Sequence, residues 1–148
     1  MDRIGLDRAA PLQALAGPSV FIMDDEPRVR DGLKNLLRSM GWAIAGGGRE
    51  ALAHANLSSG GVVLLDLALD GESGLDLIGP LRNRGLAVLV CSLHEGAHTI
   101  RRALEAGANG YLTKREAANQ LRPGMEAVLT GAPYLSPRAA AALEFNPP

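Results

Sequence analysis

The chain has 148 residues, with 15 Lys and Arg against 16 Asp and Glu, and a formal net charge of -1. This length suits one domain, and 47% hydrophobic and 21% charged residues are typical of a globular protein, which excludes a disordered chain and a strongly basic nucleic-acid-coating protein. One Cys and three His are too few for a disulfide framework or a Cys/His zinc site.

The first 18 residues mix charged and apolar side chains and lack the continuous apolar core of a secretory signal. We interpret residues 1–18 as an N-terminal extension. No later stretch is long enough to span a bilayer, so a cytoplasmic location without membrane contact is expected.

Apolar runs and helical patterns alternate from residue 19 to residue 131. Pro27 stands where a first helix begins, Gly41 ends it, and Gly46-Gly47-Gly48 reads as a flexible turn. Pro123-Gly124 falls inside the last pattern, so that helix is expected to start late or to kink. The predicted strands are 19–23, 42–45, 62–65, 86–91 and 111–112, and the predicted helices are 27–41, 50–57, 75–81, 97–106 and 121–131.

This alternation predicts an α/β fold, a flavodoxin-like doubly wound parallel sheet of five strands in the order 2-1-3-4-5 with five helices. Ligands bind such sheets at the carboxyl ends of the strands. The residues that follow those ends are chemically distinctive: Asp24 and Asp25, Asp66, Ser92, and Lys114. The order of strands places these side chains at one edge, with Asp25 near Asp66.

The segment 132–148 differs in composition from the rest. It contains four prolines around an Ala-rich stretch, Pro137 to Phe145, that is compatible with one more short helix. We predict a domain over 19–131, with 132–148 as the start of a linker.

Several sequence motifs occur in a characteristic order and at characteristic spacings. They are Met23-Asp24-Asp25-Glu26-Pro27, Asp66 with Gly74 eight residues later, Ser92 ending a strand, and Gly110-Tyr111-Leu112-Thr113-Lys114. With them the chain resembles the receiver domain of bacterial two-component response regulators over about residues 20–134. The stretches 106–114 and 131–137 are similar to the NarL/FixJ (LuxR-type) subfamily.

The resemblance implies a role for individual residues. Asp66 would be the phosphoacceptor, a carboxylate nucleophile toward a phosphohistidine, with Lys114 neutralising charge on the phosphoryl oxygens. Ser92 would bind the phosphoryl group and, by shifting, let Tyr111 rotate inward as a switch. Ala68 and His94 would border the path of the hydrolytic water. Because such a domain accepts its phosphate from a kinase, we expect no enzyme activity beyond slow autodephosphorylation.

The acidic edge also predicts a metal. Closely packed carboxylates raise one another's pKa unless a cation intervenes, and Mg²⁺ prefers carboxylate, phosphoryl and water oxygens. The resemblance assigns Asp25 and Asp66 as direct ligands, Ala68 through its backbone carbonyl, and Asp24 through water.

The partner implied by the resemblance is a sensor histidine kinase, and a homodimer is compatible with it. The subfamily implies a transcriptional output, with DNA reached only through an output domain that these residues do not include.

Two alternatives stay open: a haloacid-dehalogenase-like Mg²⁺-dependent phosphatase, and a stand-alone receiver acting by protein–protein interaction. The phosphatase would need a second acid two residues after Asp66, where Ala68 stands. A dinucleotide-binding domain is disfavoured because no glycine fingerprint follows the first strand.

Overall fold

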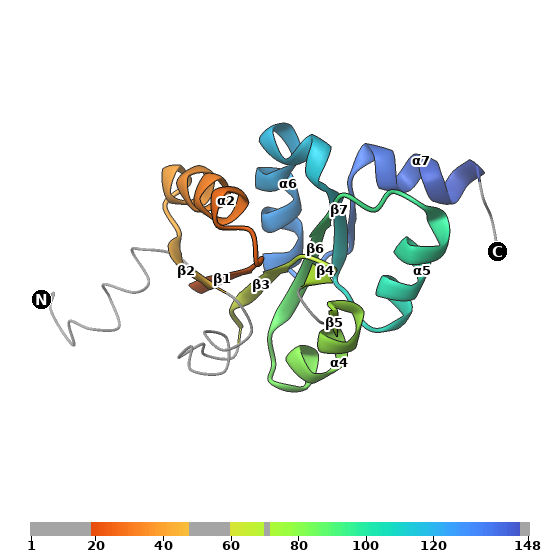
Figure 1. The fold of residues 1–148 in the computed structure, drawn as a ribbon, viewed down its shortest axis with the longest axis horizontal. Helices are drawn as coiled ribbons and strands as arrows, with labels where there is room; N and C mark the ends of the chain where they lie inside the picture. The colour runs from red at the N-terminus through yellow and green to blue at the C-terminus, as the bar shows by residue number, and fades with distance from the viewer. Residues whose placement is uncertain (1–18, 48–59, 70–71, 146–148) are drawn as a thin grey trace, which may run out of the picture.

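The structure is a computed structural model that describes residues 19–47, 60–69 and 72–145. Its main sheet is parallel and has the strand order β2-β1-β3-β6-β7-β8 (Figure 1). The strands are β1 (Ser19–Met23), β2 (Ala43–Gly47), β3 (Val62–Leu65), β6 (Ala87–Ser92), β7 (Gly110–Thr113) and β8 (Tyr134–Leu135). A small antiparallel pair, β4 (Ala68–Leu69) and β5 (Glu72–Ser73), lies between β3 and the next helix. The predicted doubly wound fold and its five-strand order are confirmed, with β8 as an additional strand.

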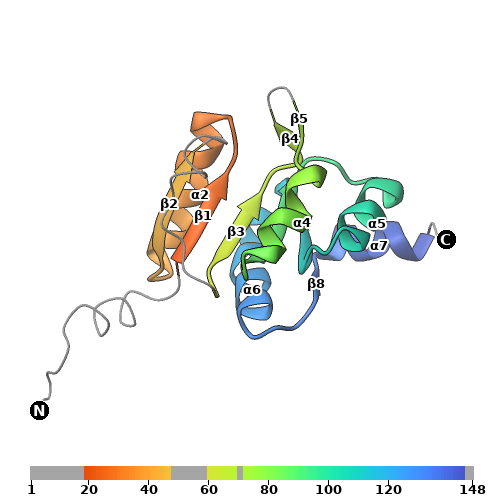
Figure 2. The same ribbon diagram turned by 90° about the horizontal axis from the view of Figure 1, so that it is seen from below.

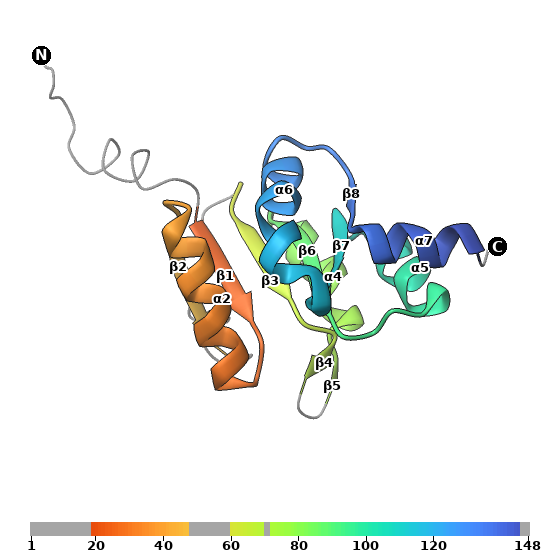
Figure 3. The same cartoon turned by 90° about the horizontal axis from the view of Figure 1, so that it is seen from above.

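Helices cover both faces of this sheet. They are α2 (Pro27–Ser39), α4 (Leu75–Asn83), α5 (Ala97–Glu105), the 3-10 helix η1 (Lys114–Glu116), α6 (Ala117–Leu129) and α7 (Pro137–Phe145). Viewed from below the sheet, α4 lies in front of it (Figure 2), and from above α2 and α6 cover the other face (Figure 3). The helix predicted over 50–57 lies outside the described residues. None of the described helices is long and apolar enough to cross a membrane.

Two cores result from the period of two along the strands. Phe21 and Met23 of β1 point into the core beneath α4, α5 and α7, whereas Val20 and Ile22 point into the core beneath α2 and α6. All four side chains are buried, as in a sheet covered on both faces. The strands therefore read as continuous apolar runs, which is why the sequence predicted them.

The glycines after the second predicted strand do not form the expected turn at 46–47. Gly46 and Gly47 end β2, in register with Ile22 and Met23 of β1. A Cβ at Gly46 would lie 3.0 Å from the Ile22 carbonyl oxygen, so glycine suits the close approach of the two strands.

The late start expected as one alternative for the last predicted helix is wrong, whereas the kink expected as the other alternative stays a prediction. Helix α6 begins at Ala117 and continues past Pro123 to Leu129. Gly124 is buried there, and a Cβ on it would lie 3.1 Å from the Tyr134 ring. Packing of α6 on β8 thus explains the glycine, and tertiary contacts outweigh the backbone hydrogen bond that Pro123 removes.

The Ala-rich segment forms the helix that its composition suggested. Helix α7 spans the anticipated residues, and it lies alongside α5 (Figure 1). Strand β8, which precedes α7 in the chain, was not predicted. Its residues Tyr134 and Leu135 pair with Gly110 and Tyr111 of β7. Two residues are too few for a recognisable alternating pattern.

Candidate functional site

The chain turns sharply after β1 and buries Asp24 at the carboxyl edge of the sheet. Asp24 is 2% exposed, and its Oδ1 accepts a hydrogen bond of 2.8 Å from the Glu26 backbone N–H. Arg30 in α2 donates from Nη1 to the Asp24 backbone oxygen at 2.7 Å. Asp25, the next residue, is partly exposed. The start of α2 therefore fixes the position of Asp24.

Asp66 occupies the same edge at the end of β3. Its backbone N–H donates to the Met23 carbonyl at 3.0 Å, which extends the β1–β3 ladder by one step. Its side chain is nearly buried, and Oδ1 accepts a hydrogen bond of 3.3 Å from the Ala68 N–H. Gly74 closes the loop that follows, with its N–H 2.7 Å from the Leu67 carbonyl oxygen.

Lys114 links the two carboxylates. Its Nζ donates to Asp24 Oδ2 at 2.8 Å and lies 3.2 Å from Asp66 Oδ2. The lysine begins η1, directly after β7, so the short turn directs its side chain across the strand ends. Its side chain is 14% exposed, so the ammonium acts in a region with little solvent screening.

The charges of this group are unbalanced, because one ammonium faces two carboxylates. Burial raises the pKa of Asp66, the Lys114 charge lowers it and the Asp24 charge raises it, and the net shift is upward. For Lys114, burial lowers the pKa, but the hydrogen bond to Asp24 and the charges of both acids outweigh burial, so its pKa is raised. A bound cation would relieve the remaining negative charge.

Ser92 and Tyr111 lie together beside this edge. Both side chains are fully buried; Ser92 Oγ accepts the His94 N–H at 3.1 Å, and the Tyr111 hydroxyl donates to the His94 carbonyl at 2.7 Å. Burial raises the pKa of Tyr111 to about 12, partly offset by a side-chain hydrogen bond with Ser92. In this structure Tyr111 therefore has the inward orientation, and both hydroxyls contact one stretch of backbone. The His94 side chain itself is exposed.

The candidate metal ligands at this edge are oxygen atoms, the type that suits a magnesium ion with part of its water retained. Within the described part of the chain, no group of three or more His, Cys, Asp or Glu is disposed to hold a metal. Mg²⁺ in phosphoryl-transfer sites commonly uses one or two carboxylates, with phosphate and water oxygens completing its shell. The groups that the resemblance assigns, Asp25, Asp66 and the Ala68 carbonyl, offer oxygen atoms only, which is the ligand type that Mg²⁺ prefers.

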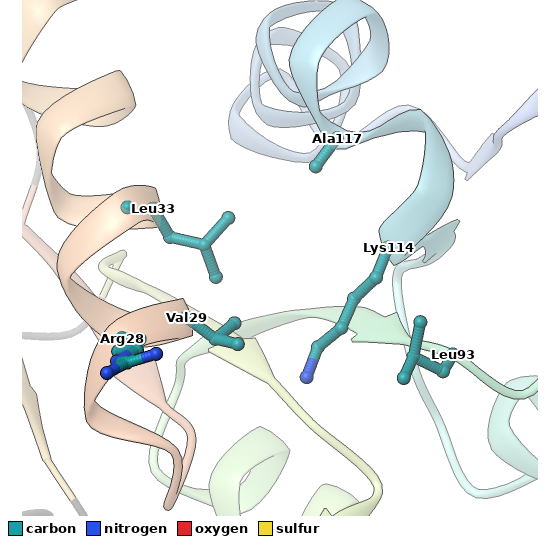
Figure 4. A pocket seen from close by; sticks show the side chains of 7 residues that line it. Arg28, Val29, Leu33, Leu93, Lys114 and Ala117 are labelled. Carbon is teal, nitrogen blue, oxygen red and sulfur yellow. The ribbon is translucent and has the colours of Figure 1, made fainter.

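A cavity of about 330 Å³ opens beside Lys114. Figure 4 shows the lysine reaching into the space between Val29 of α2 and Leu93 of the loop after β6. Leu93 is 64% exposed. The cavity is lined by Arg28, Val29, Gly32, Leu33, Leu93, Lys114 and Ala117.

The structure thus brings Asp24, Asp66 and Lys114 into direct contact and places Ser92 against Tyr111. Sequence reasoning missed the support from Arg30, because a basic residue in the first turn of a helix carries no distinctive signal. It also missed an ion pair next to the site, where Arg138 of α7 binds Glu95.

This chain is similar to known proteins along most of its length. The family model of the response regulator receiver domain matches residues 20–126. The transcriptional regulatory protein UhpA of Salmonella typhimurium is 36% identical over 129 residues, which are 84% of this chain and 65% of UhpA. The nitrate/nitrite response regulator protein NarP of Escherichia coli is 34% identical, over 80% of this chain and 58% of NarP. The chain therefore spans less than two thirds of these relatives.

Solved structures give the same result. A LuxR-family two-component response regulator from Aurantimonas sp. superposes with a TM-score of 0.75 at 27% identity, covering 86% of this chain and 95% of that chain. The response regulator RcsB of Salmonella typhimurium has a TM-score of 0.76 at 21% identity, covering 87% and 68%. At that identity RcsB supports the fold alone.

Proposed function

Since this chain belongs to the response regulator receiver domain family, we propose that Asp66 accepts a phosphoryl group from a histidine kinase. The observation that carries the proposal is the Lys114 ammonium, 3.2 Å from Asp66 Oδ2 and 2.8 Å from Asp24 Oδ2 at the carboxyl edge of the sheet. A nucleophile, a cation and a further carboxylate are the parts that phosphoryl transfer to an aspartate requires.

Each residue has a task in the transfer. A carboxylate oxygen of Asp66 bonds to phosphorus as the phosphorus–nitrogen bond of the phosphohistidine breaks. Lys114 stabilises the negative charge on the phosphoryl oxygens, and Ser92 hydrogen-bonds the bound group. Asp25, Asp66, the Ala68 carbonyl and, through water, Asp24 would hold a magnesium ion. That ion, when bound, neutralises further charge on the phosphoryl group.

The apolar cavity beside Lys114 supports a protein as the phosphodonor. A phosphohistidine must approach Asp66 past α2 and the loop after β6, so the surface around the cavity would lie against the kinase. Val29, Leu33 and the exposed Leu93 provide apolar contact there, and Arg28 adds a positive charge at the rim.

The modified state is expected to hydrolyse slowly. Ala68 is exposed and offers only a methyl group, which neither orients an attacking water nor blocks it. His94 is the other residue at this approach. The same methyl group disfavours the phosphatase alternative, because no acid stands where that mechanism needs one.

The likeness to UhpA and NarP, both named as regulators, supports a transcriptional output. We propose that this receiver acts on DNA only through an output domain outside these 148 residues.

RcsB, which shares the fold, is described as dimers bound to DNA. A homodimer favoured by phosphorylation is the corresponding proposal here, and light scattering before and after modification measures it.

Acetyl phosphate with Mg²⁺ tests the phosphoacceptor directly. Intact-mass spectrometry should show the gain of one phosphoryl group in the wild type and none in Asp66→Asn. Asp76→Asn, which removes an exposed acid from α4, should still be modified. A phosphorylated Asp66→Asn variant, or steady turnover of a generic phosphate ester, would contradict the proposal.

A further inference from the structure

We propose that the ion pair between Glu95 and Arg138 couples the phosphorylation site to helix α7. The proposal rests on the proposed function, in which Asp66 is phosphorylated and Ser92 and Tyr111 respond. It adds the route by which that response reaches the segment after the last sheet strand.

The first part of the route is the loop between β6 and α5. The backbone of His94 is held from two sides, by Ser92 Oγ, which accepts its N–H, and by the Tyr111 hydroxyl, which donates to its carbonyl. Glu95 is the next residue. A movement of either hydroxyl therefore shifts the position from which the Glu95 carboxylate extends.

The second part of the route is a bidentate contact between the Glu95 carboxylate and Arg138 of α7. Arg138 Nε lies 3.0 Å from Glu95 Oε2, and Arg138 Nη2 lies 3.2 Å from Glu95 Oε1. Two parallel hydrogen bonds fix the relative orientation of both groups, which a single contact does not. Arg115 of η1 adds a longer contact of 3.6 Å to the same carboxylate.

The start of α7 is attached to the same region through its backbone. Arg138 N–H donates to Glu116 Oε1 at 3.0 Å, and Glu116 Oε2 accepts from Thr113 Oγ1 at 2.8 Å. Ser136 is fully buried; its N–H donates to the Tyr111 carbonyl at 3.0 Å, and its Oγ accepts the Thr113 N–H at 3.2 Å. The residue that precedes α7 is thus hydrogen-bonded to β7, the strand that carries Tyr111.

The exposure of the pair makes it suitable for switching. The side chains of Glu95 and Arg138 are 26% and 53% exposed, so the contact can break without leaving a buried charge unpaired. The buried Ser136 and Ala139 instead keep the start of α7 attached. Breaking the ion pair therefore loosens α7 against the loop that precedes α5 without detaching it.

The direction of the coupling follows from the inward Tyr111. In this orientation Tyr111 holds the loop, Glu95 reaches Arg138, and α7 is docked. Phosphorylation draws Ser92 Oγ from the His94 N–H to the phosphoryl group, so the Tyr111 hydroxyl becomes the main contact that holds the loop. By favouring the inward orientation of Tyr111, phosphorylation should strengthen docking. Because coupling is reciprocal, weaker docking should reduce affinity for a phosphoryl analogue by the same factor.

Hydrogen exchange of amides 137–145, with and without beryllofluoride and Mg²⁺, tests the coupling. Fluorine NMR reports loading of the site in the same samples. In the wild type, loading should slow exchange in α7 at least about fivefold, the lower end of typical allosteric coupling. Glu95→Ala and Arg138→Ala should load but lose that gain. Glu105→Ala, which removes an exposed acid from the far end of α5, should keep it.

A further variant makes the result independent of phosphorylation. Tyr111→Phe removes only the hydroxyl that holds His94, and it should speed exchange in unmodified α7. Equal exchange in Tyr111→Phe and wild type would overturn the coupling, as would a loaded wild type whose α7 does not respond, or a full response in Glu95→Ala. A wild type that neither loads nor accepts a phosphoryl group would instead refute the proposed function, and the coupling with it.

Discussion

Lys114 is the residue on which the electrostatics of the site depend. Its ammonium lies closer to Asp24 than to Asp66, at 2.8 Å against 3.2 Å. Only two lysines occur among 15 basic residues. A compact ammonium with rotatable donors can serve two carboxylates and later a phosphoryl oxygen, a task that the fixed fork of an arginine suits less well.

Replacing this lysine by glutamine should affect both stability and transfer. Lys114→Gln leaves two nearly buried carboxylates without their cation, which we expect to lower the free energy of unfolding by about 1–3 kcal/mol. Phosphorylation by acetyl phosphate should slow by about a hundredfold, the typical effect of removing one stabilising donor. Denaturant unfolding and mass spectrometry measure the two effects. Lys34→Gln, at the other lysine, is the control; equal losses in both variants would contradict the assignment.

The raised pKa of Asp66 gives a prediction about pH. Because its folded-state pKa lies above the ordinary value of 3.8, the folded state binds the proton more tightly than the unfolded state. The ionised carboxylate therefore lowers stability as pH rises from about 4 through the folded pKa. Asp66→Asn removes this effect and should be more stable than the wild type at pH 7. The difference should disappear below about pH 4; thermal unfolding across this range would show the opposite trend if the pKa were lowered.

At the scale of elements, the loop from β3 to α4 positions the phosphoacceptor. Its backbone is closed by the Gly74 N–H on the Leu67 carbonyl, and the short β4–β5 pair projects from it. A Cβ at Gly74 would collide with the Asp66 carbonyl oxygen and lie 2.8 Å from Leu67 Cα. The requirement here is for space, since the φ of Gly74 is -62° and open to any residue.

Gly74→Ala should therefore disturb Asp66 itself. We expect a loss of about 1–3 kcal/mol in the free energy of unfolding, as for other overpacked sites, together with slower phosphorylation. Gly32→Ala in α2 is the matched control. No atom lies within 4 Å of a Cβ built there, and alanine in a helix should stabilise by about 0.5–1 kcal/mol. Denaturant unfolding of both variants checks this; a neutral Gly74→Ala would show that the loop can move aside.

At the scale of the whole molecule, the last two elements complete one core. Ala139 of α7 is fully buried among residues of α4, α5 and the sheet, and Leu135 and Leu143 pack against the same cluster. Tyr134 covers Gly110 and Gly124 on the opposite face. Residues 134–145 are thus part of the folded body, although the proposed linker toward an output domain begins in the same segment.

Removing this segment should destabilise the protein. A chain ending at residue 131 loses β8 and α7 and exposes the core beneath them, and we expect the free energy of unfolding to fall by at least about 2 kcal/mol. A chain ending at residue 145 keeps every described element and is the control. Denaturant unfolding compares the two; equal stability would place residues 132–145 outside the cooperative unit.

Patterns along the chain predict the order of the sheet and the chemistry of its edge. Runs such as 20–23 and 62–65 are apolar throughout because both faces of these strands are covered, and Asp24 and Asp66 follow directly at the carboxyl ends of the strands. Pro27 and Gly41 mark the ends of a helix by local backbone chemistry. These signals are local, so they can be read without coordinates.

Which side chains meet depends on how segments far apart in the chain pack together. The contact of Lys114 with Asp24 joins residues 90 positions apart, and that of Arg138 with Glu95 joins residues 43 apart. Gly46 and Gly47 became strand, and Pro123 stayed within a helix, because pairing with β1 and packing on β8 outweighed local preference. Distances between side chains depend on how helices and strands pack, and local patterns such as apolar runs and turn residues do not show those distances.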